Sequence, residues 1–257
     1  KSGTTYFRKL EVGERGDLWE VRHPFLSSMN LHTWPLLEEL SDCSSILLAG
    51  AGGGFDIYSG LPLYFALREA GKDVHLANYS FTALPLDKKF RVATKCVKVT
   101  ADTPEAGMYF PELRLSQWFR EERGEEIPVY AFPRTGVVPL AAAYRKLHKL
   151  HKFDAVILVD GGTDSLMRGD EAGLGTPVED MTSIAAAMES GIAKRYLACI
   201  GFGVDTFHGV CHAQFLEAVA ALASEDAYLG LSAVLRKMPE AELFLSAVDF
   251  ANRHTPL

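Results

Sequence analysis

Short, mainly apolar segments alternate along the chain with longer segments whose apolar residues recur at helical spacing. The short segments have four or five residues, as in AVILV at 155–159, which is the length of a strand and not of a helix. Strands without polar alternation are typical of a parallel sheet that is buried on both faces. We therefore predict an α/β chain with a mostly parallel central sheet. Its strands are expected at 46–49, 74–77, 96–99, 128–132, 155–159 and 196–200.

The segments between these strands predict helices, and several helix ends are marked by their residues. Thr176 and Glu179, with Pro177 between them, have the spacing of a capping box with proline at the first helical position. Gly71 and Gly191 lie where a helix needs a left-handed residue after its last turn. Helices are expected at 61–70, 112–123, 138–150, 181–190, 211–223 and 231–237.

The residue totals restrict the classes of function. With 26 Lys and Arg against 33 Asp and Glu, the net charge is 26 − 33 = −7, which offers no basic surface to nucleic acid or to an anionic membrane. The length fits one domain over 1–257, in which 1–43, with mixed turn and aromatic signals, form a small N-terminal lobe. The four cysteines form no CxxC pair and no run of 18 apolar residues occurs. We therefore expect a cytoplasmic protein with reduced thiols and a small-molecule ligand, and leave homo-oligomerisation open.

A glycine-rich segment, LAGAGGGFD, follows the first predicted strand. In a parallel sheet this turn lies at the carboxyl edge, where backbone N–H groups and the next helix can bind a phosphate. The segment departs from the dinucleotide fingerprint because Phe55 replaces its last glycine, and because Asn78, not an acidic residue, ends the second strand. The alternative is a sharp turn that only allows close helix packing. Asp56 is expected to cap the helix, with a sugar hydroxyl, an amine or a metal ion as alternative partners.

The segment VDGGTDSLMRGDEAGLGTPVED, which follows the 155–159 strand, is strongly acidic. It holds six acidic residues and one basic residue, Arg168, between 160 and 180. Carboxylates at this edge suit a Mg²⁺ ion that bridges to a phosphate, ribose hydroxyls, or acid–base chemistry. Glu179 and Asp180 are assigned to the first turn of the next helix, where acidic residues are favoured without any ligand. The site prediction for this loop is therefore restricted to Asp160, Asp164, Arg168 and Glu171.

A third glycine-bearing segment, GFGVDTFHGVCH, follows the 196–200 strand. The spacing of Asp205, His208 and His212 puts them on one face if a helix begins near Asp205. His208 is the best candidate for proton transfer, because an unperturbed imidazole titrates near neutral pH. The alternative is a histidine that is only structural or exposed.

Several motifs, taken in order, resemble those of the family named domain of unknown function 1152. They are GAGGGFDIYSGLPL, NYSF, YFPE, VDGGTDSLMRGDE, GTPVED and GFGVDTFHG, and they extend over residues 44–230. The resemblance implies a Rossmann-like three-layer sandwich of the kind found in archaea and bacteria. It brings no established activity, so no catalytic role is transferred. GAGGGFDIYSGLP is also similar to the opening of sirtuin-type NAD-binding domains, but the spacing differs and the zinc cysteine pairs are absent, which argues against protein deacylation.

We expect the three loops to meet at one edge, because parallel strands with right-handed crossovers bring their carboxyl ends together. The leading hypothesis is a protein, leaning to an enzyme of unspecified reaction class, that binds a nucleotide or another phosphorylated metabolite with Mg²⁺. The alternative is a non-catalytic scaffold. It is supported by the aromatic residues Trp19, Phe25 and Trp34 and by the segment YFPELRLSQWF.

The predicted site is drawn from these loops. For ligand binding we predict Gly50, Gly52, Gly53, Gly54, Asp56, Asn78, Gly161, Gly162 and Arg168. For catalysis we predict Asp164, Glu171 and His208, and for metal binding Asp160 and Asp164. Gly53, Asp164 and His208 are expected to line one pocket.

Overall fold

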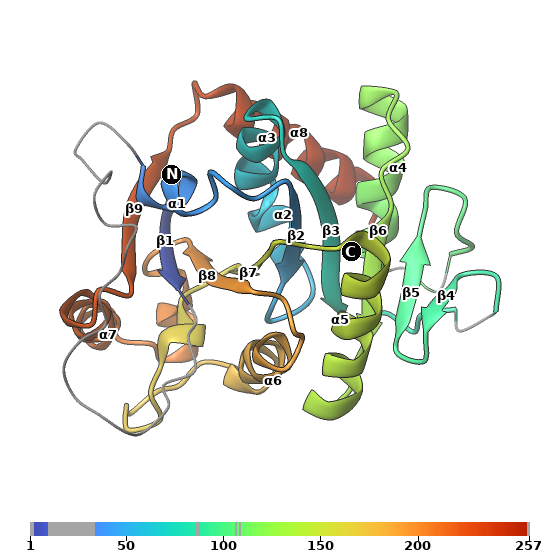
Figure 1. Cartoon of the computed structure of the whole chain (residues 1–257). Coiled ribbons are helices and arrows are strands. Elements are labelled where there is room, and N and C mark those ends of the chain that lie inside the picture. Colours follow the sequence, from blue (N-terminus) through green and yellow to red (C-terminus); the bar gives the residue numbers. More distant parts are fainter. Residues whose placement is uncertain (1–2, 10–33, 86–87, 106, 108, 256–257) are drawn as a thin grey trace.

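The computed structural model describes residues 3–9, 34–85, 88–105, 107 and 109–255. In these residues, nine strands form one sheet in the order β4-β5-β6-β3-β2-β7-β8-β1-β9 (Figure 1). The strands are β1 Gly3–Lys9, β2 Ser45–Gly50, β3 Asp73–Ser80, β4 Arg91–Ala93, β5 Cys96–Val99, β6 Val129–Pro133, β7 Ala155–Asp160, β8 Lys194–Ile200 and β9 Tyr228–Val234.

The centre of the sheet consists of five parallel strands in the order β6-β3-β2-β7-β8. Numbered along the chain, these five read 3-2-1-4-5, which is the Rossmann order. All six residues of β7 are buried, as a strand covered on both faces requires. The five strands predicted for this part of the sheet are confirmed, and so is the Rossmann-like, mostly parallel architecture.

The two edges of the sheet are antiparallel. β5 pairs antiparallel with β6 on one edge, and β1 lies between β8 and β9 on the other. The helix predicted at 231–237 is wrong, because β9 occupies most of that range: residues 231–234 pair antiparallel with residues 3–6 of β1. Of the N-terminal lobe predicted at 1–43, the described start is β1, a strand of this sheet, and residues 10–33 lie outside the described part.

Helices cover both faces of the sheet and complete three layers (Figure 1). Buried side chains of one face pack against α1 Pro35–Glu39, α2 Asp56–Ser59, α3 Leu61–Glu69, α4 Pro111–Arg123 and α8 Pro239–His254. Those of the other face pack against α5 Val137–His151, α6 Pro177–Met188 and α7 His212–Ser224. The helices predicted in these places are confirmed, although α6 begins four residues earlier than expected and α8 was not predicted.

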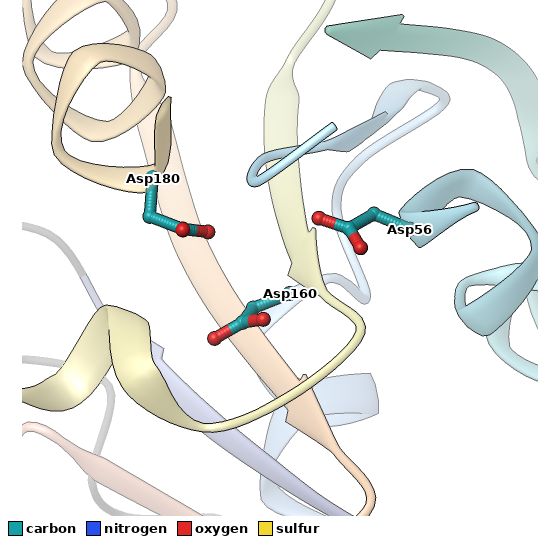
Figure 2. A group of neighbouring side chains, drawn as sticks. All are labelled: Asp56, Asp160 and Asp180. Carbon is teal, nitrogen blue, oxygen red and sulfur yellow. The ribbon is translucent and has the colours of Figure 1, made fainter. Parts of the chain in front are cut away.

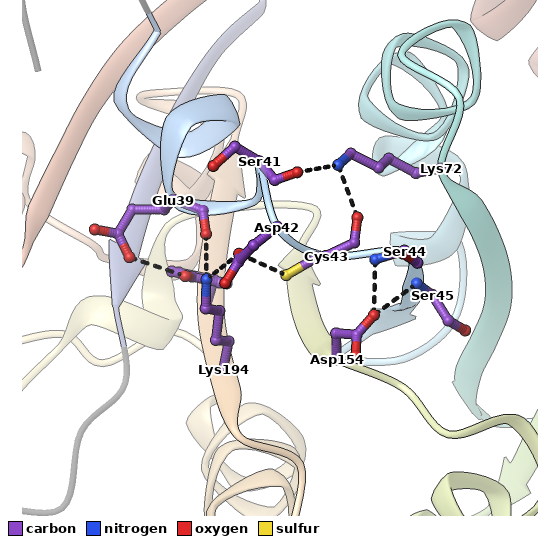
Figure 3. Close-up of polar contacts among 10 residues, drawn as sticks. Glu39, Ser41, Asp42, Cys43, Ser44, Ser45, Lys72, Asp154 and Lys194 are labelled. Carbon is purple, nitrogen blue, oxygen red and sulfur yellow. Dashed lines mark hydrogen bonds and ion pairs between the residues drawn. The ribbon is translucent and has the colours of Figure 1, made fainter. Parts of the chain in front are cut away.

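The amino edge of the sheet is held together by a polar network (Figure 3). The Asp154 carboxylate, just before β7, accepts hydrogen bonds from the backbone N–H groups of Ser44 and Ser45 at 2.7 and 2.9 Å. The Lys194 ammonium, at the start of β8, donates to the Glu39 carbonyl and pairs with Asp42. These contacts tie β2 to β7 and β8 at the end opposite their carboxyl termini, and so align the loops that leave the carboxyl edge.

The carboxyl edge has a switch point between β2 and β7. From β2 the chain continues into α2 and α3 on one face, whereas from β7 it continues to α6 on the other. Neighbouring parallel strands whose connections diverge in this way leave a crevice between their loops, and ligands of such sheets bind there. The glycine-rich segment and the acidic segment are therefore the two loops of the switch point.

The segment that supported a scaffold, YFPELRLSQWF, is mostly internal. Phe110, Trp118 and Phe119 are fully buried, and the rings of Trp118 and Phe119 meet edge to face with their centroids 4.9 Å apart. Trp19 and Phe25 lie outside the described residues. None of the helices in the described part of the chain has the length and apolar character needed to cross a membrane.

Candidate functional site

Three carboxylates from three different elements converge at the switch point (Figure 2). Asp56 is the first residue of α2, Asp160 is the last residue of β7, and Asp180 lies in the first turn of α6. One oxygen from each of them lies within 4.8 Å of the other two. We call these three residues the carboxylate triad.

The triad is held in a poorly hydrated place. Asp160 and Asp180 are 3% and 2% exposed, and Asp56 is partly exposed. Burial, together with the negative charge of Asp164, raises the pKa of Asp160 to about 6. Burial and the charges of Asp160 and Asp56 raise the pKa of Asp180 to about 10. The pKa of Asp56 is also raised, by burial and by Asp160, so the three groups resist carrying their charges together.

Hydrogen bonds satisfy the triad only in part. Asp56 Oδ2 accepts from the Gly52 N–H at 2.6 Å, and the Asp160 oxygens accept from the N–H groups of Gly162 and Ser165 at 2.7 and 3.1 Å. Asp180 Oδ1 is buried and has no hydrogen-bond partner in the described residues. Within that part of the chain, no lysine or arginine forms an ion pair with the triad.

The predicted glycines make room for these carboxylates. A Cβ on Gly52 would lie 2.8 Å from both Asp180 Oδ1 and Asp56 Oδ2, and a Cβ on Gly161 would lie 2.6 Å from Asp56 Oδ1. Real Cβ atoms do not approach oxygens so closely, so any other residue would push the triad apart. Gly162 meets the carboxylate of Asp205 in the same way. At these three glycines the loops therefore face carboxylates of the protein itself, whereas the sequence predicted that they face a bound phosphate.

Other parts of the glycine loop are fastened to neighbouring elements. The Asn78 side-chain amide donates to the Gly54 carbonyl at 2.9 Å and to Glu112 Oε1 at 2.7 Å, so the amide predicted to bind a ligand links the loop to α4. Gly50 leaves space for the Asn78 side-chain oxygen. The capping role expected of Asp56 is wrong, because Phe55 is the N-cap of α2 and Asp56 accepts from Gly52 instead.

Asp164 lies next to the triad and caps α6. Its Oδ2 accepts hydrogen bonds from the N–H and the hydroxyl of Thr176 at 2.7 and 3.3 Å. The predicted capping box is therefore wrong in its bonding: the Thr176 side chain makes no cap bond to the helix, and Glu179 pairs with Arg134 at 3.0 Å. The cap is taken over by a residue twelve positions earlier, which sequence spacing alone does not indicate.

The remaining predicted residues are engaged away from the triad. The Glu171 carboxylate accepts from the N–H groups of Arg168 and Gly169, and Arg168 faces Glu217 on α7 at 3.8 Å. His208 Nδ1 lies 3.7 Å from Asp205 Oδ1, and its side chain is 60% exposed. These side chains share the carboxyl edge with Gly53, but a common pocket for Gly53, Asp164 and His208 stays a prediction.

The helix expected to begin near Asp205 is broken. The 3-10 helix η2 Val204–His208 ends at Gly209, whose φ is +84°, and α7 begins only at His212. Asp205, His208 and His212 therefore do not form one helical face. The reason is the left-handed glycine, which ends a helix rather than continuing it.

Sequence reasoning set aside one member of the triad. The sequence places Asp180 in the first turn of a helix, where acidic residues are common without any ligand, and this local signal hides its position at the switch point. A usable signal was present: α6 follows the acidic loop directly, so its first turn had to begin near the same edge.

Comparison with protein families places residues 114–249, just over half of the chain, in the family described as "Protein of unknown function (DUF1152)". The chain belongs to the DUF1152 family. No curated protein and no solved structure matches it. The DUF1152 match includes Asp160 and Asp180 but begins after Asp56, so it covers two of the three triad residues.

The family description supplies no activity, so the chemistry of this DUF1152 chain has to come from its site. Carboxylate oxygens are the preferred ligands of hard divalent cations such as Mg²⁺, Mn²⁺ and Ca²⁺. The triad offers one oxygen from each of three residues, and one buried oxygen, Asp180 Oδ1, finds no hydrogen-bond partner in the part of the chain that the structure describes. This arrangement is suited to a cation and unsuited to a bare anion.

Proposed function

We propose that this protein binds a divalent cation of the Mg²⁺ type through Asp56, Asp160 and Asp180, and through the cation a nucleotide or another phosphorylated metabolite. The observation that carries the proposal is Asp180 Oδ1, a buried oxygen that has no hydrogen-bond partner among the described residues and belongs to a triad of converging carboxylates. A buried, unpaired polar oxygen is unfavourable, and a cation at the triad would satisfy it.

The alternative to a cation is that the triad is simply protonated, because protonation also removes the repulsion between neighbouring carboxylates. Two features favour a cation. The three groups come from the end of one strand and the first turns of two helices at the switch point, where ligands of this fold bind. The glycines facing the triad keep it free of other side chains, a need that a sealed, protonated cluster would not impose.

A phosphorylated ligand follows from the coordination chemistry of the cation. Mg²⁺ is octahedral and in proteins is usually held by a few carboxylates, with waters and substrate phosphates at its other positions. A triad that supplies one oxygen per residue leaves such positions open. A cation there would polarise a phosphoryl oxygen and offset the charge of the ligand against the acidic loop.

The experiment is a calorimetric and thermal-shift titration of the purified protein with Mn²⁺ and Mg²⁺, alone and with pyrophosphate. We expect cation binding that Asp180→Asn weakens at least tenfold. Asp170→Asn is the matched control, because it removes the same charge from an exposed position in the same loop and should leave binding unchanged.

The same pair of variants excludes a trivial loss of fold. The raised pKa of Asp180 means that its carboxyl group must take up a proton when the metal-free chain folds at neutral pH, a cost that asparagine avoids. Without a cation, Asp180→Asn should therefore unfold at the same or a higher temperature than the parent protein. If the parent protein shows no cation-dependent shift up to millimolar concentration, or if Asp180→Asn binds as well as the parent, the proposed function is wrong.

A further inference from the structure

Three exposed aromatic side chains surround the glycine loop. Phe55, Phe81 and Tyr109 are 37%, 45% and 38% exposed, although rings of this size are normally well buried. They come from three different places at the carboxyl edge: the loop after β2, the end of β3, and the segment before α4. We call them the aromatic cluster.

The cluster is built around the two left-handed glycines. A Cβ on Gly53, whose φ is +99°, would lie 2.7 Å from the Phe81 ring. A Cβ on Gly54, whose φ is +62°, would lie 2.7 Å from the Tyr109 hydroxyl and 3.7 Å from Phe81. The rings of Phe55 and Tyr109 meet edge to face with their centroids 5.7 Å apart.

Arg134, from the loop after β6, adds a cation to this cluster. Its guanidinium carbon lies 5.5 Å from the centre of the Phe81 ring, and the side chain is 69% exposed. The same guanidinium pairs with Glu179 in the first turn of α6, one residue before Asp180. Arg134 therefore lies between the aromatic cluster and the helix end that carries part of the triad.

The aromatic cluster and the triad are adjacent through the backbone of one loop. Gly52 faces Asp56 and Asp180, and Gly53, the next residue, faces Phe81. Consecutive Cα atoms are about 3.8 Å apart, so one small molecule can reach both groups at once. The ligand that fits both has a planar apolar part at one end and metal-binding oxygens at the other.

We propose that the aromatic cluster is the subsite for the base of a nucleotide whose phosphates bind the cation at the triad. This inference rests on the proposed function and narrows it, from phosphorylated metabolites in general to nucleoside di- and triphosphates. Bases stack on aromatic rings and on arginine planes with little dependence on their identity, and the cluster offers both. The first three strands of a Rossmann sheet form one mononucleotide-binding half. Here these strands are β2, β3 and β6, and the aromatic cluster lies on their side of the switch point.

The test compares ligands that share phosphates and differ in the base. In the presence of Mn²⁺, the affinities of ADP, GDP, CDP and UDP are measured by calorimetry against those of pyrophosphate and ribose 5-phosphate. We expect at least one nucleotide to bind about tenfold or more tightly than pyrophosphate, the gain that stacking of one base supplies.

The variant series separates stacking from simple packing. Phe81→Trp, which keeps a ring, should retain the nucleotide preference, whereas Phe81→Leu and Phe81→Ala should lose it and still bind pyrophosphate as the parent does. Phe207→Ala is the control, because Phe207 is 98% exposed in η2, after β8 and on the far side of β7. It should leave every affinity unchanged.

The failures of the two proposals are distinguishable. If Mn²⁺ and pyrophosphate bind but no nucleotide binds more tightly, or if Phe81→Ala keeps the preference, the base subsite is wrong and the cation site stands. If Mn²⁺ does not bind while a nucleotide binds in a Phe81-dependent way, the base subsite stands and the cation site is wrong.

Discussion

Glu112, in the first turn of α4, is a fully buried carboxyl group linked to the glycine loop through Asn78. Burial raises its pKa from about 4.5 to about 7, in opposition to the hydrogen bond from Asn78, which lowers it. Its Oε2 has no hydrogen-bond partner in the described residues. At the residue scale, this group joins α4 to the loop while resisting ionisation.

The consequence is a pH-dependent stability. Between about pH 4.5 and 7 the folded protein holds the Glu112 proton, whereas the unfolded chain has released it. The contribution of protonated Glu112 to the free energy of unfolding therefore falls as the pH rises through this range, and it is lost above about pH 7. Glu112→Gln cannot ionise. It should raise the free energy of unfolding by about 3 kcal/mol at pH 8, and by less than about 1 kcal/mol at pH 5. Urea unfolding at the two pH values measures the difference. Glu121→Gln, exposed on the same helix, is the control, and an equal effect of Glu112→Gln at both pH values would contradict the assignment.

At the element scale, the glycine loop matters because its lack of side chains leaves room for the carboxylates of the triad. Gly52 is not left-handed, so its backbone tolerates other residues, but the side chain of any of them would enter the triad. Its N–H also donates to Asp56. The backbone of Gly52 thus binds the Asp56 carboxylate, and the missing side chain of Gly52 leaves room for the Asp180 carboxylate.

Gly52→Ala should therefore remove cation binding while leaving the fold intact. The new Cβ would lie 2.8 Å from oxygens of both Asp56 and Asp180 and would push these two carboxylates out of place. Thermal shift with Mn²⁺ is the readout, and we expect the shift to disappear. Gly136→Ala is the matched control, because a Cβ there meets no atom within 4 Å. Retention of the Mn²⁺ shift in Gly52→Ala would show that the cation binds elsewhere.

At the scale of the whole molecule, the triad exists because the chain folds α2 and α6 onto opposite faces of the sheet while β7 lies beside β2. Asp56 and Asp180 are more than a hundred residues apart in the sequence, and each alone would be an ordinary surface acid. Their convergence in a buried place raises the pKa values of both carboxyl groups, so a cation bound there, as proposed, would compete with protons for the same oxygens.

Cation binding should consequently release protons. At pH 7 the metal-free protein keeps a proton on Asp180, whose pKa is about 10, whereas Asp160, with a pKa of about 6, is mostly ionised. A cation must displace the Asp180 proton, so its affinity should rise roughly tenfold per pH unit between 7 and 9. Calorimetry in two buffers of different ionisation enthalpy counts the protons. An affinity that does not change with pH would exclude Asp180 as a ligand.

The local elements and their order follow from the residue pattern alone. Apolar runs such as AVILV and the amphipathic stretches between them predicted all five parallel strands and most helices, because periodicity is a local property of a chain. It also identified Asp160 and the glycines of the switch-point loops. Where an apolar run was short and lay at an edge, as at β9, the same reasoning failed, since pairing with β1 decided its conformation.

Which acidic residues meet depends on how the elements pack in three dimensions. Asp164 and Asp180 have the same type of local context, a helix start in an acidic loop, yet Asp164 caps α6 and Asp180 joins the triad. The difference lies in how α6 sits over Gly52, where the Ser183 hydroxyl bonds the Ala51 carbonyl at 2.7 Å. Local propensity cannot specify such a contact, because it depends on which strands are neighbours and on which face each connection takes.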